Sequence, residues 1–124
     1  MLTQETFLAL RVLEDDHEMG AEEKVCVAEQ ALGSAPNLGL LYLRYGTNLQ
    51  ESGRGEEALA AYRRGLSCPE DAQTRARLLV RRALIDTNKY EKRACLEEAA
   101  SSKADLVAAA TAYLFLRDTP PPVQ

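Results

Sequence analysis

One histidine, His17, is the first candidate for chemistry because acidic residues surround it in the sequence. It follows Asp15 and Asp16 and precedes Glu18, and both imidazole and carboxylate groups bind metal ions. A single histidine in a charged run near a helix end more often belongs to a solvated surface. We therefore predict no metal site.

Three cysteines and one glycine-rich turn are further candidates for redox or phosphate chemistry. Cys26, Cys68 and Cys95 are odd in number and far apart, without a C-x-x-C pair, so we predict reduced thiols. The segment Gly53-Arg54-Gly55 is expected to form a turn, since the rest of a phosphate-binding motif is missing. The sequence carries no nucleophile-elbow, Walker or dinucleotide-binding motif. It predicts a non-enzymatic protein without a cofactor.

Arg77 and Arg81 are four residues apart and would project from the same face of a helix. Guanidinium groups can hold a carboxylate through two hydrogen bonds. The alternative is that these arginines and their neighbours solvate an exposed helix and pair with Asp71 or Asp86. The sequence leaves both interpretations open.

The composition is that of one α-helical domain. Of 124 residues, 46% are hydrophobic and 27% charged, with only 7 Gly and 5 Pro. The net charge of −4 runs from −6 over residues 1–38 to +2 over residues 71–124, and this acidic balance argues against nucleic-acid binding. The first residues lack the features of a secretory signal, and the longest apolar stretch, residues 108–116, is too short to span a bilayer. We expect a cytoplasmic protein without membrane contact.

Residues 40–69 contain the clearest structural pattern, two amphipathic helices joined by a tight turn. Apolar or small residues recur at helical spacing on one face of each helix. These residues are Tyr42, Tyr45, Gly46 and Leu49 in the first helix, and Ala58, Leu59, Tyr62, Gly65 and Leu66 in the second. Gly53 is placed to end the first helix in a left-handed conformation. Because glycine inside a helix costs roughly 1 kcal/mol relative to alanine, Gly46 and Gly65 predict a close approach between helices.

This hairpin resembles the tetratricopeptide repeat (TPR), a 34-residue helical hairpin with a W-x2-L-G-x2-Y signature in its first helix. Tyr42, Tyr45, Gly46 and Leu49 stand at those four places, and Ala58, Tyr62 and Gly65 at the Ala, Phe and second small places. Pro69 stands one residue before the place of the repeat-ending proline. The resemblance implies an all-α fold, a right-handed α-solenoid.

Steps of 34 residues extend the pattern in both directions, since Glu23 and Glu91 both correspond to Glu57. We therefore predict a single domain over residues 1–118. It would contain three TPR-like hairpins at about 5–38, 39–72 and 73–103 and a C-terminal capping helix at 104–117. Residues 119–124 hold three consecutive prolines and are predicted to form a disordered tail.

The first and last helices fit the repeat less well than the central hairpin. In the first helix, either Leu8 and Val12 or the set Phe7, Leu10 and Leu13 would face inward. The last helix is expected to begin with a capping box formed by Ser102 and Asp105.

By resemblance to TPR proteins, the first helix of each pair lines a concave groove that binds a peptide or a partner helix. The groove residues carried over are Leu13, Leu40, Leu43, Thr47, Gln50, Arg77, Arg81 and Leu84. The family's clamp for a C-terminal carboxylate needs Lys and Asn where this chain has Ala9 and Leu13, so a clamp of that type is not expected. The two arginines favour an acidic ligand or one with a free C-terminal carboxylate.

The last helix gives a second hypothesis, a homodimer or structural scaffold. This helix is apolar nearly all round, and a contiguous apolar surface usually marks an interface. Val107, Ala110 and Leu114 would contact a second copy of the chain. The alternative is that the helical array encloses this helix fully.

Overall fold

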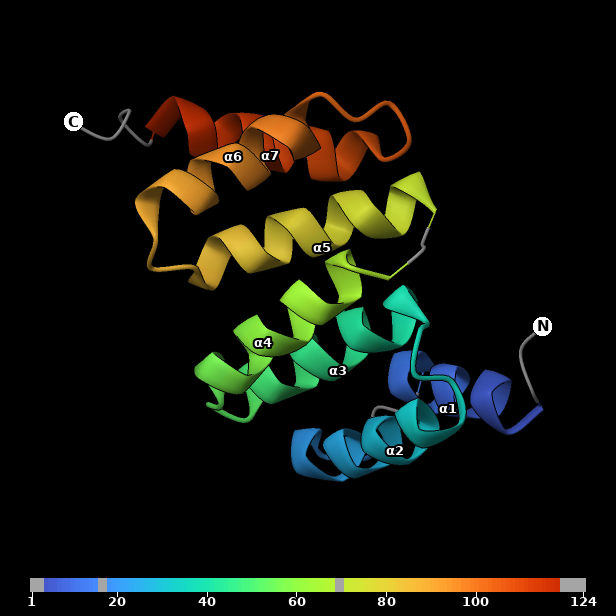
Figure 1. Ribbon diagram of the computed structural model, residues 1–124. Helices are drawn as coiled ribbons and strands as arrows, with labels where there is room; N and C mark the ends of the chain where they lie inside the picture. The colour runs from blue at the N-terminus through green and yellow to red at the C-terminus, as the bar shows by residue number, and fades with distance from the viewer. Residues whose placement is uncertain (1–3, 16–17, 69–70, 119–124) are drawn as a thin grey trace. The chain divides into compact units, whose positions relative to one another are not determined.

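Seven α-helices make up the part of the chain that the structure describes (Figure 1). This computed structural model describes residues 4–15, 18–68 and 71–118. The helices are α1 (Gln4–Asp15), α2 (Ala21–Ser34), α3 (Gly39–Glu51), α4 (Gly55–Leu66), α5 (Ala72–Ile85), α6 (Lys89–Ala100) and α7 (Leu106–Asp118). No strand occurs in these ranges, and the prediction of an all-α fold is confirmed. His17 and the predicted tail lie outside the described residues.

The chain divides into two compact units, which we call the N-terminal unit (Met1–Glu70) and the C-terminal unit (Asp71–Gln124). In the N-terminal unit each helix packs against the next, and α1 also contacts α3. In the C-terminal unit α6 packs against both α5 and α7, and α5 also contacts α7. Packing between adjacent helices is what a helical repeat requires. Whether the two units form the predicted single domain depends on how they join, so the single domain stays a prediction.

The first three helices enclose a core in the N-terminal unit. The cluster consists of Leu10, Leu13, Ala28, Ala31 and Leu41.

The first helix turns Thr6, Leu10 and Leu13 inward, whereas Phe7 and Leu8 are each more than half exposed. The prediction that Leu8 faces inward is therefore wrong. The alternative register is right for Leu10 and Leu13 but wrong for Phe7. A threonine completes the buried face, and an apolar pattern does not detect it.

The predicted hairpin is formed by α3 and α4. Gly53 has a φ of 78°, and the amide of Arg54 donates a hydrogen bond to the carbonyl of Leu49 at 2.8 Å. A Cβ added to Gly46 would lie 2.7 Å from Cδ1 of Tyr62, whose ring is fully buried. The left-handed turn and the close approach at Gly46 are both confirmed.

Side chains that accept backbone hydrogen bonds begin the helices of the C-terminal unit. Asp71 accepts from the amide of Thr74 at 2.7 Å, which caps α5. Asp105 accepts from the amide of Ala108 at 3.0 Å, which caps α7. The predicted capping box is therefore wrong, because Asp105 is itself the cap and α7 begins two residues later than expected. Asp is as effective at this position as Ser.

Candidate functional site

The predicted groove residues of the N-terminal unit take part in its internal packing. Leu13 and Leu43 are 5% and 3% exposed, and the half-buried Leu40 packs against the core cluster. The Thr47 hydroxyl donates to the carbonyl of Leu43 at 2.8 Å. The Gln50 side chain accepts a hydrogen bond from a tyrosine hydroxyl of α4 at 3.0 Å. These contacts leave limited apolar surface on this side of α3.

A polar pocket of about 360 Å³ nevertheless opens beside two of these residues. We call it the α1–α3 pocket. Its lining comes from α1, α2 and α3 and consists of Leu13, Glu14, Lys24, Arg44, Thr47, Asn48 and Glu51. The structure thus brings Leu13 and Thr47 together, with charged residues that the sequence pattern did not single out.

Arg44 ties α3 to α1 at this pocket. Its Nη2 donates to Oε1 of Glu14 at 3.0 Å. Its Nε is buried and has no hydrogen-bond acceptor among the described residues. The side chains of Lys24 and Glu51 have no ion-pair or hydrogen-bond partner there either. The α1–α3 pocket therefore offers both positive and negative groups to a ligand.

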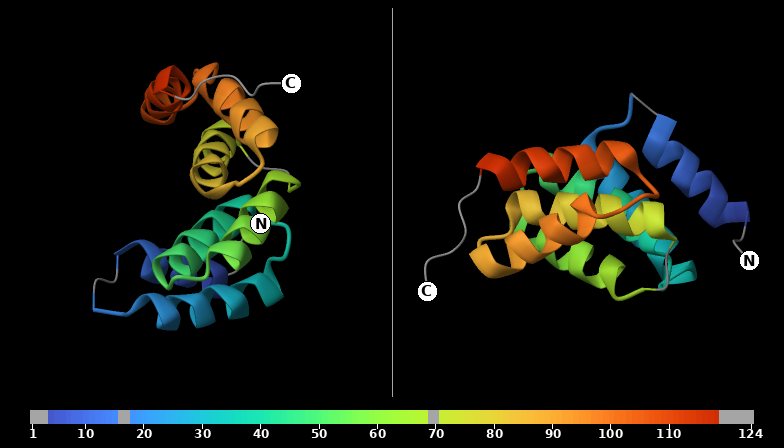
Figure 2. Two further views of the ribbon diagram at one scale, coloured as in Figure 1. Left: turned by 90° about the vertical axis from the view of Figure 1, so that its left-hand side faces the viewer. Right: turned by 90° about the horizontal axis from the view of Figure 1, so that it is seen from above.

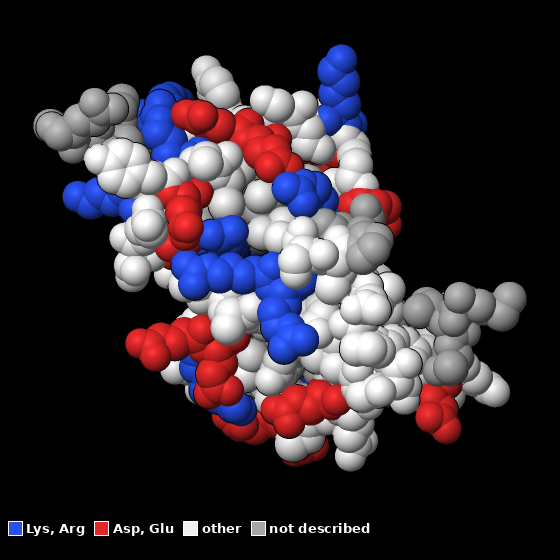
Figure 3. Space-filling model, viewed as in Figure 1, with Lys and Arg blue, Asp and Glu red and all other residues white. Residues whose placement is uncertain are grey.

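In the C-terminal unit, α5 carries four arginines, and Figure 3 shows Lys and Arg side chains over this helix with acidic side chains nearby. Three of the four are held by acidic side chains of the same unit. The pairs are Arg75 with Glu98 at 2.5 Å, Arg77 with Asp105 at 2.8 Å, and Arg82 with Asp86 at 3.3 Å and Glu91 at 2.9 Å. Arg81 has no such partner among the described residues. The ion-pair interpretation therefore applies to Arg82, which contacts Asp86 as expected, and to Arg77, whose partner is Asp105 instead.

The contact between Arg77 and Asp105 fixes the start of α7 to α5. The amide of Ala108 and the guanidinium of Arg77 lower the pKa of the Asp105 carboxyl below its ordinary value. Leu84, the third groove residue expected on α5, is 37% exposed. The sequence could not reveal the ion pair, because its two residues are 28 positions apart.

Among the described helices, α7 carries the most large hydrophobic side chains that are exposed. The helix packs on its own unit through Ala108 and Ala112, which are 6% and 0% exposed. The opposite side carries a row that we call the α7 stripe, namely Leu106, Val107, Ala110, Tyr113 and Leu114. Figure 2 shows α7 at the edge of the C-terminal unit, with α5 and α6 on one side of it. All three residues predicted for self-association belong to the stripe.

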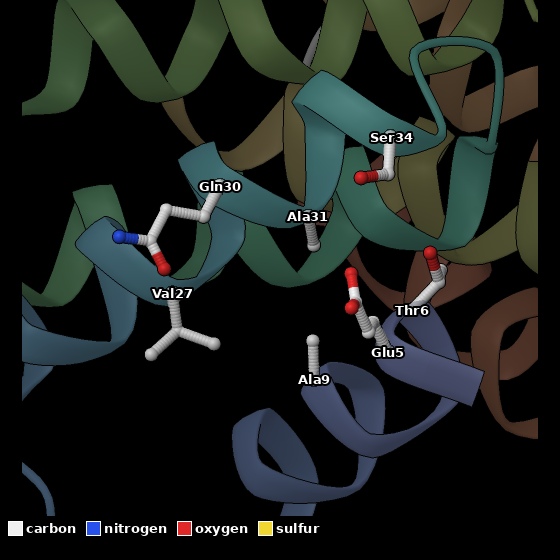
Figure 4. A pocket seen from close by; sticks show the side chains of 7 residues that line it. All are labelled: Glu5, Thr6, Ala9, Val27, Gln30, Ala31 and Ser34. Atoms are coloured by element: carbon white, nitrogen blue, oxygen red, sulfur yellow. The ribbon is translucent and has the colours of Figure 1, made fainter. Parts of the chain in front are cut away.

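Two further pockets lie within the N-terminal unit. The pocket between α1 and α2 has a volume of about 260 Å³, and Figure 4 shows Ala9, Val27 and Ala31 around the space between the helices. A second, of about 510 Å³, is lined by residues of α2, α3 and α4 that include Tyr42 and Tyr45. Small side chains leave the pocket between α1 and α2 open, and its lining contains no pair of oppositely charged residues.

The reactive side chains do not gather into a catalytic or metal-binding group in the described residues. No cluster of three or more His, Cys, Asp and Glu side chains suited to a metal ion occurs there. Cys26 is exposed, Cys68 is half-buried and Cys95 is buried, and none of the three forms a disulfide in the described residues. Burial raises the pKa of the Cys95 thiol. None of the helices in the described ranges combines the length and apolar character needed to cross a bilayer.

Comparisons with family models, with curated proteins and with solved structures give no match for this chain. The all-α architecture with packing between adjacent helices is compatible with a helical repeat.

Proposed function

We propose that this chain is a non-enzymatic protein-interaction module whose contact surface is the α7 stripe. The observation that carries this proposal is the exposure of the stripe, where Leu106 and Val107 are each 77% exposed, Tyr113 64% and Leu114 49%. Burying one large apolar side chain contributes about 1.5–3 kcal/mol. A surface that forgoes this gain at four neighbouring positions is best explained by a partner that covers it.

A second copy of the chain is the partner that we propose for the stripe. The test is sedimentation velocity over a concentration series, comparing wild type with Leu114→Glu. The control is Leu8→Glu, since Leu8 on α1 is 53% exposed and Leu114 is 49% exposed. We expect wild type and Leu8→Glu to approach twice the 13.7 kDa chain mass, while Leu114→Glu stays a monomer. Equal masses for all three proteins would refute self-association through α7.

The α1–α3 pocket supports a second candidate, the binding of a peptide or partner helix in the predicted groove. The specific observation is the buried Nε of Arg44, which has no acceptor, beside the unpaired side chains of Lys24 and Glu51. A buried donor without a partner costs about 1–3 kcal/mol, so a ligand that brings an acceptor would be favoured. The mixed charges suit the backbone and side chains of an extended peptide that carries a carboxylate.

A peptide library displayed on phage tests this second candidate. Selected peptides are titrated onto isotope-labelled protein, and we expect NMR shift changes at Leu13, Thr47 and Glu51. Lys24→Glu should weaken binding by about tenfold, the effect of roughly 1.4 kcal/mol. The matched control is Lys89→Glu, the same charge change at an exposed lysine of the C-terminal unit. Equal weakening by both variants would reject the pocket.

We also propose that the pairs α1–α2, α3–α4 and α5–α6 are TPR repeats in a right-handed solenoid, and that the protein works in the cytoplasm. The contacts of α3 with α1, α2 and α4 and the glycine contact with Tyr62 support the repeat assignment. An experimental structure of the full chain would test the handedness. A left-handed or non-repeating arrangement of the pairs would contradict the assignment.

A further inference from the structure

The α7 stripe is symmetric about Ala110. Its large members lie three and four residues before Ala110, at Leu106 and Val107, and three and four residues after it, at Tyr113 and Leu114. If the direction of the helix is reversed about Ala110, each large side chain of the stripe falls at the position of another large side chain, and Ala110 falls at its own position. A two-fold symmetric contact requires a surface that is complementary to itself in this way.

We propose that two copies of the chain pair through the α7 stripe in antiparallel orientation, with the two-fold axis at Ala110. This inference rests on the self-association proposed above and adds its geometry. Val107 of one copy then lies opposite Tyr113 and Leu114 of the other. The exposed Ala110 residues face each other, and their small size lets the two helix backbones approach closely.

The helix dipoles favour the antiparallel orientation. A parallel pair would align the two dipoles side by side, whereas an antiparallel pair sets them in opposition, which is the favourable arrangement.

The size of the surface predicts a weak, reversible dimer. Stable specific interfaces bury roughly 1,200–2,000 Å² in total, and one pair of short helices with five contact residues each lies below that range. The dimer should therefore dissociate on dilution.

Disulfide trapping distinguishes the two orientations. The background protein carries Cys26→Ser and Cys68→Ser and keeps the buried Cys95. Val107→Cys and Leu114→Cys are oxidised separately and as a mixture, and Ala110→Cys is oxidised alone. Val107 and Leu114 are exposed, so both substitutions leave the packing of the unit intact. Circular dichroism checks that each variant keeps its helix content.

The antiparallel arrangement predicts a disulfide dimer in the mixture and with Ala110→Cys. In that arrangement the two Val107 positions are about 9 Å apart along the axis, at about 1.5 Å per residue, whereas a disulfide needs Cα atoms within about 7 Å. Each single variant at 107 or 114 should therefore form several-fold less dimer than the mixture.

Two results would overturn the inference. One rejects only the antiparallel orientation, and the other also rejects self-association through α7. Efficient dimer formation by Val107→Cys alone and by Leu114→Cys alone would show a parallel pair. Self-association through α7 would then stand and its orientation would be wrong. No disulfide dimer with any variant would reject the self-association as well.

Discussion

The glycine at position 46 lets a tyrosine ring pack directly on the backbone of α3. A Cβ at this position would lie 2.7 Å from Cδ1 and 2.9 Å from Cζ of Tyr62. The ring has no room to move away, because it is fully buried and its hydroxyl donates to Gln50. We expect Gly46→Ala to lower the free energy of unfolding by about 1–3 kcal/mol, as overpacking does in cores. Urea denaturation followed by circular dichroism measures this change.

Gly33 provides the matched control for that substitution. It lies in α2, is exposed, and a Cβ added there meets no atom within 4 Å. Gly33→Ala should therefore raise the free energy of unfolding by up to about 1 kcal/mol through helix propensity alone. A stabilising effect of Gly46→Ala would show that the ring does not pack on α3 as described.

Asp105 makes the stability of the C-terminal unit depend on pH. Its pKa is lowered in the folded protein, by the amide of Ala108 and by Arg77. A carboxyl with a lowered folded pKa stabilises the fold above its unfolded pKa of about 3.9, and this stabilisation is lost as the pH falls through the folded value. Asp105→Asn keeps an acceptor for the Ala108 amide but loses the charge that faces Arg77 and the N-terminus of α7. It should therefore cost about 0.3–1 kcal/mol at pH 7, and much less below pH 4.

Thermal unfolding of both proteins between pH 7 and pH 2 gives this comparison. Asp118→Asn is the control, since the Asp118 side chain is 72% exposed in its pair with Arg117. A constant difference between wild type and Asp105→Asn at every pH would rule out the charge as the stabilising group.

At the scale of the helices, much of the fold was predictable from apolar periodicity and glycine positions. The hairpin of α3 and α4 appears at the expected residues, with Gly53 in the left-handed conformation. The errors occur where a polar side chain takes a structural role. Thr6 fills the buried face of α1, and Asp105 replaces Ser102 at the cap of α7. Hydrophobic patterns do not include such residues, so the register and the boundary were missed.

The cysteines of α2 and α6 report on the opening of those helices. Cys26 is exposed on α2, while Cys95 is buried on α6 and its pKa is raised by burial. The thiolate is the reactive form of cysteine. In native protein at pH 8, iodoacetamide should therefore alkylate Cys26 much faster than Cys95. Mass spectrometry of peptides after timed iodoacetamide treatment measures both rates. Equal rates would mean that α6 opens readily or is not packed as described.

At the scale of the whole molecule, the candidate sites depend on contacts between distant parts of the sequence. Places in a repeat predict the groove residues, but Leu13 and Leu43 contribute to packing instead. Arg44 and Lys24 meet at a pocket through the stacking of α2 on α3, which single helices do not reveal. The exposed side of α7 was better predicted, because an apolar helix at the end of a small helical unit has few elements to cover it.

The central claim is that the α7 stripe contacts a second copy of the chain, and an NMR dilution series of the wild-type protein tests it most directly. Backbone amide shifts are followed from millimolar to low micromolar concentration without any substitution. The account predicts concentration-dependent shifts that concentrate at Leu106, Val107, Ala110, Tyr113 and Leu114, with the rest of the spectrum nearly constant. Superimposable spectra at all concentrations, or shifts confined to helices other than α7, would contradict it.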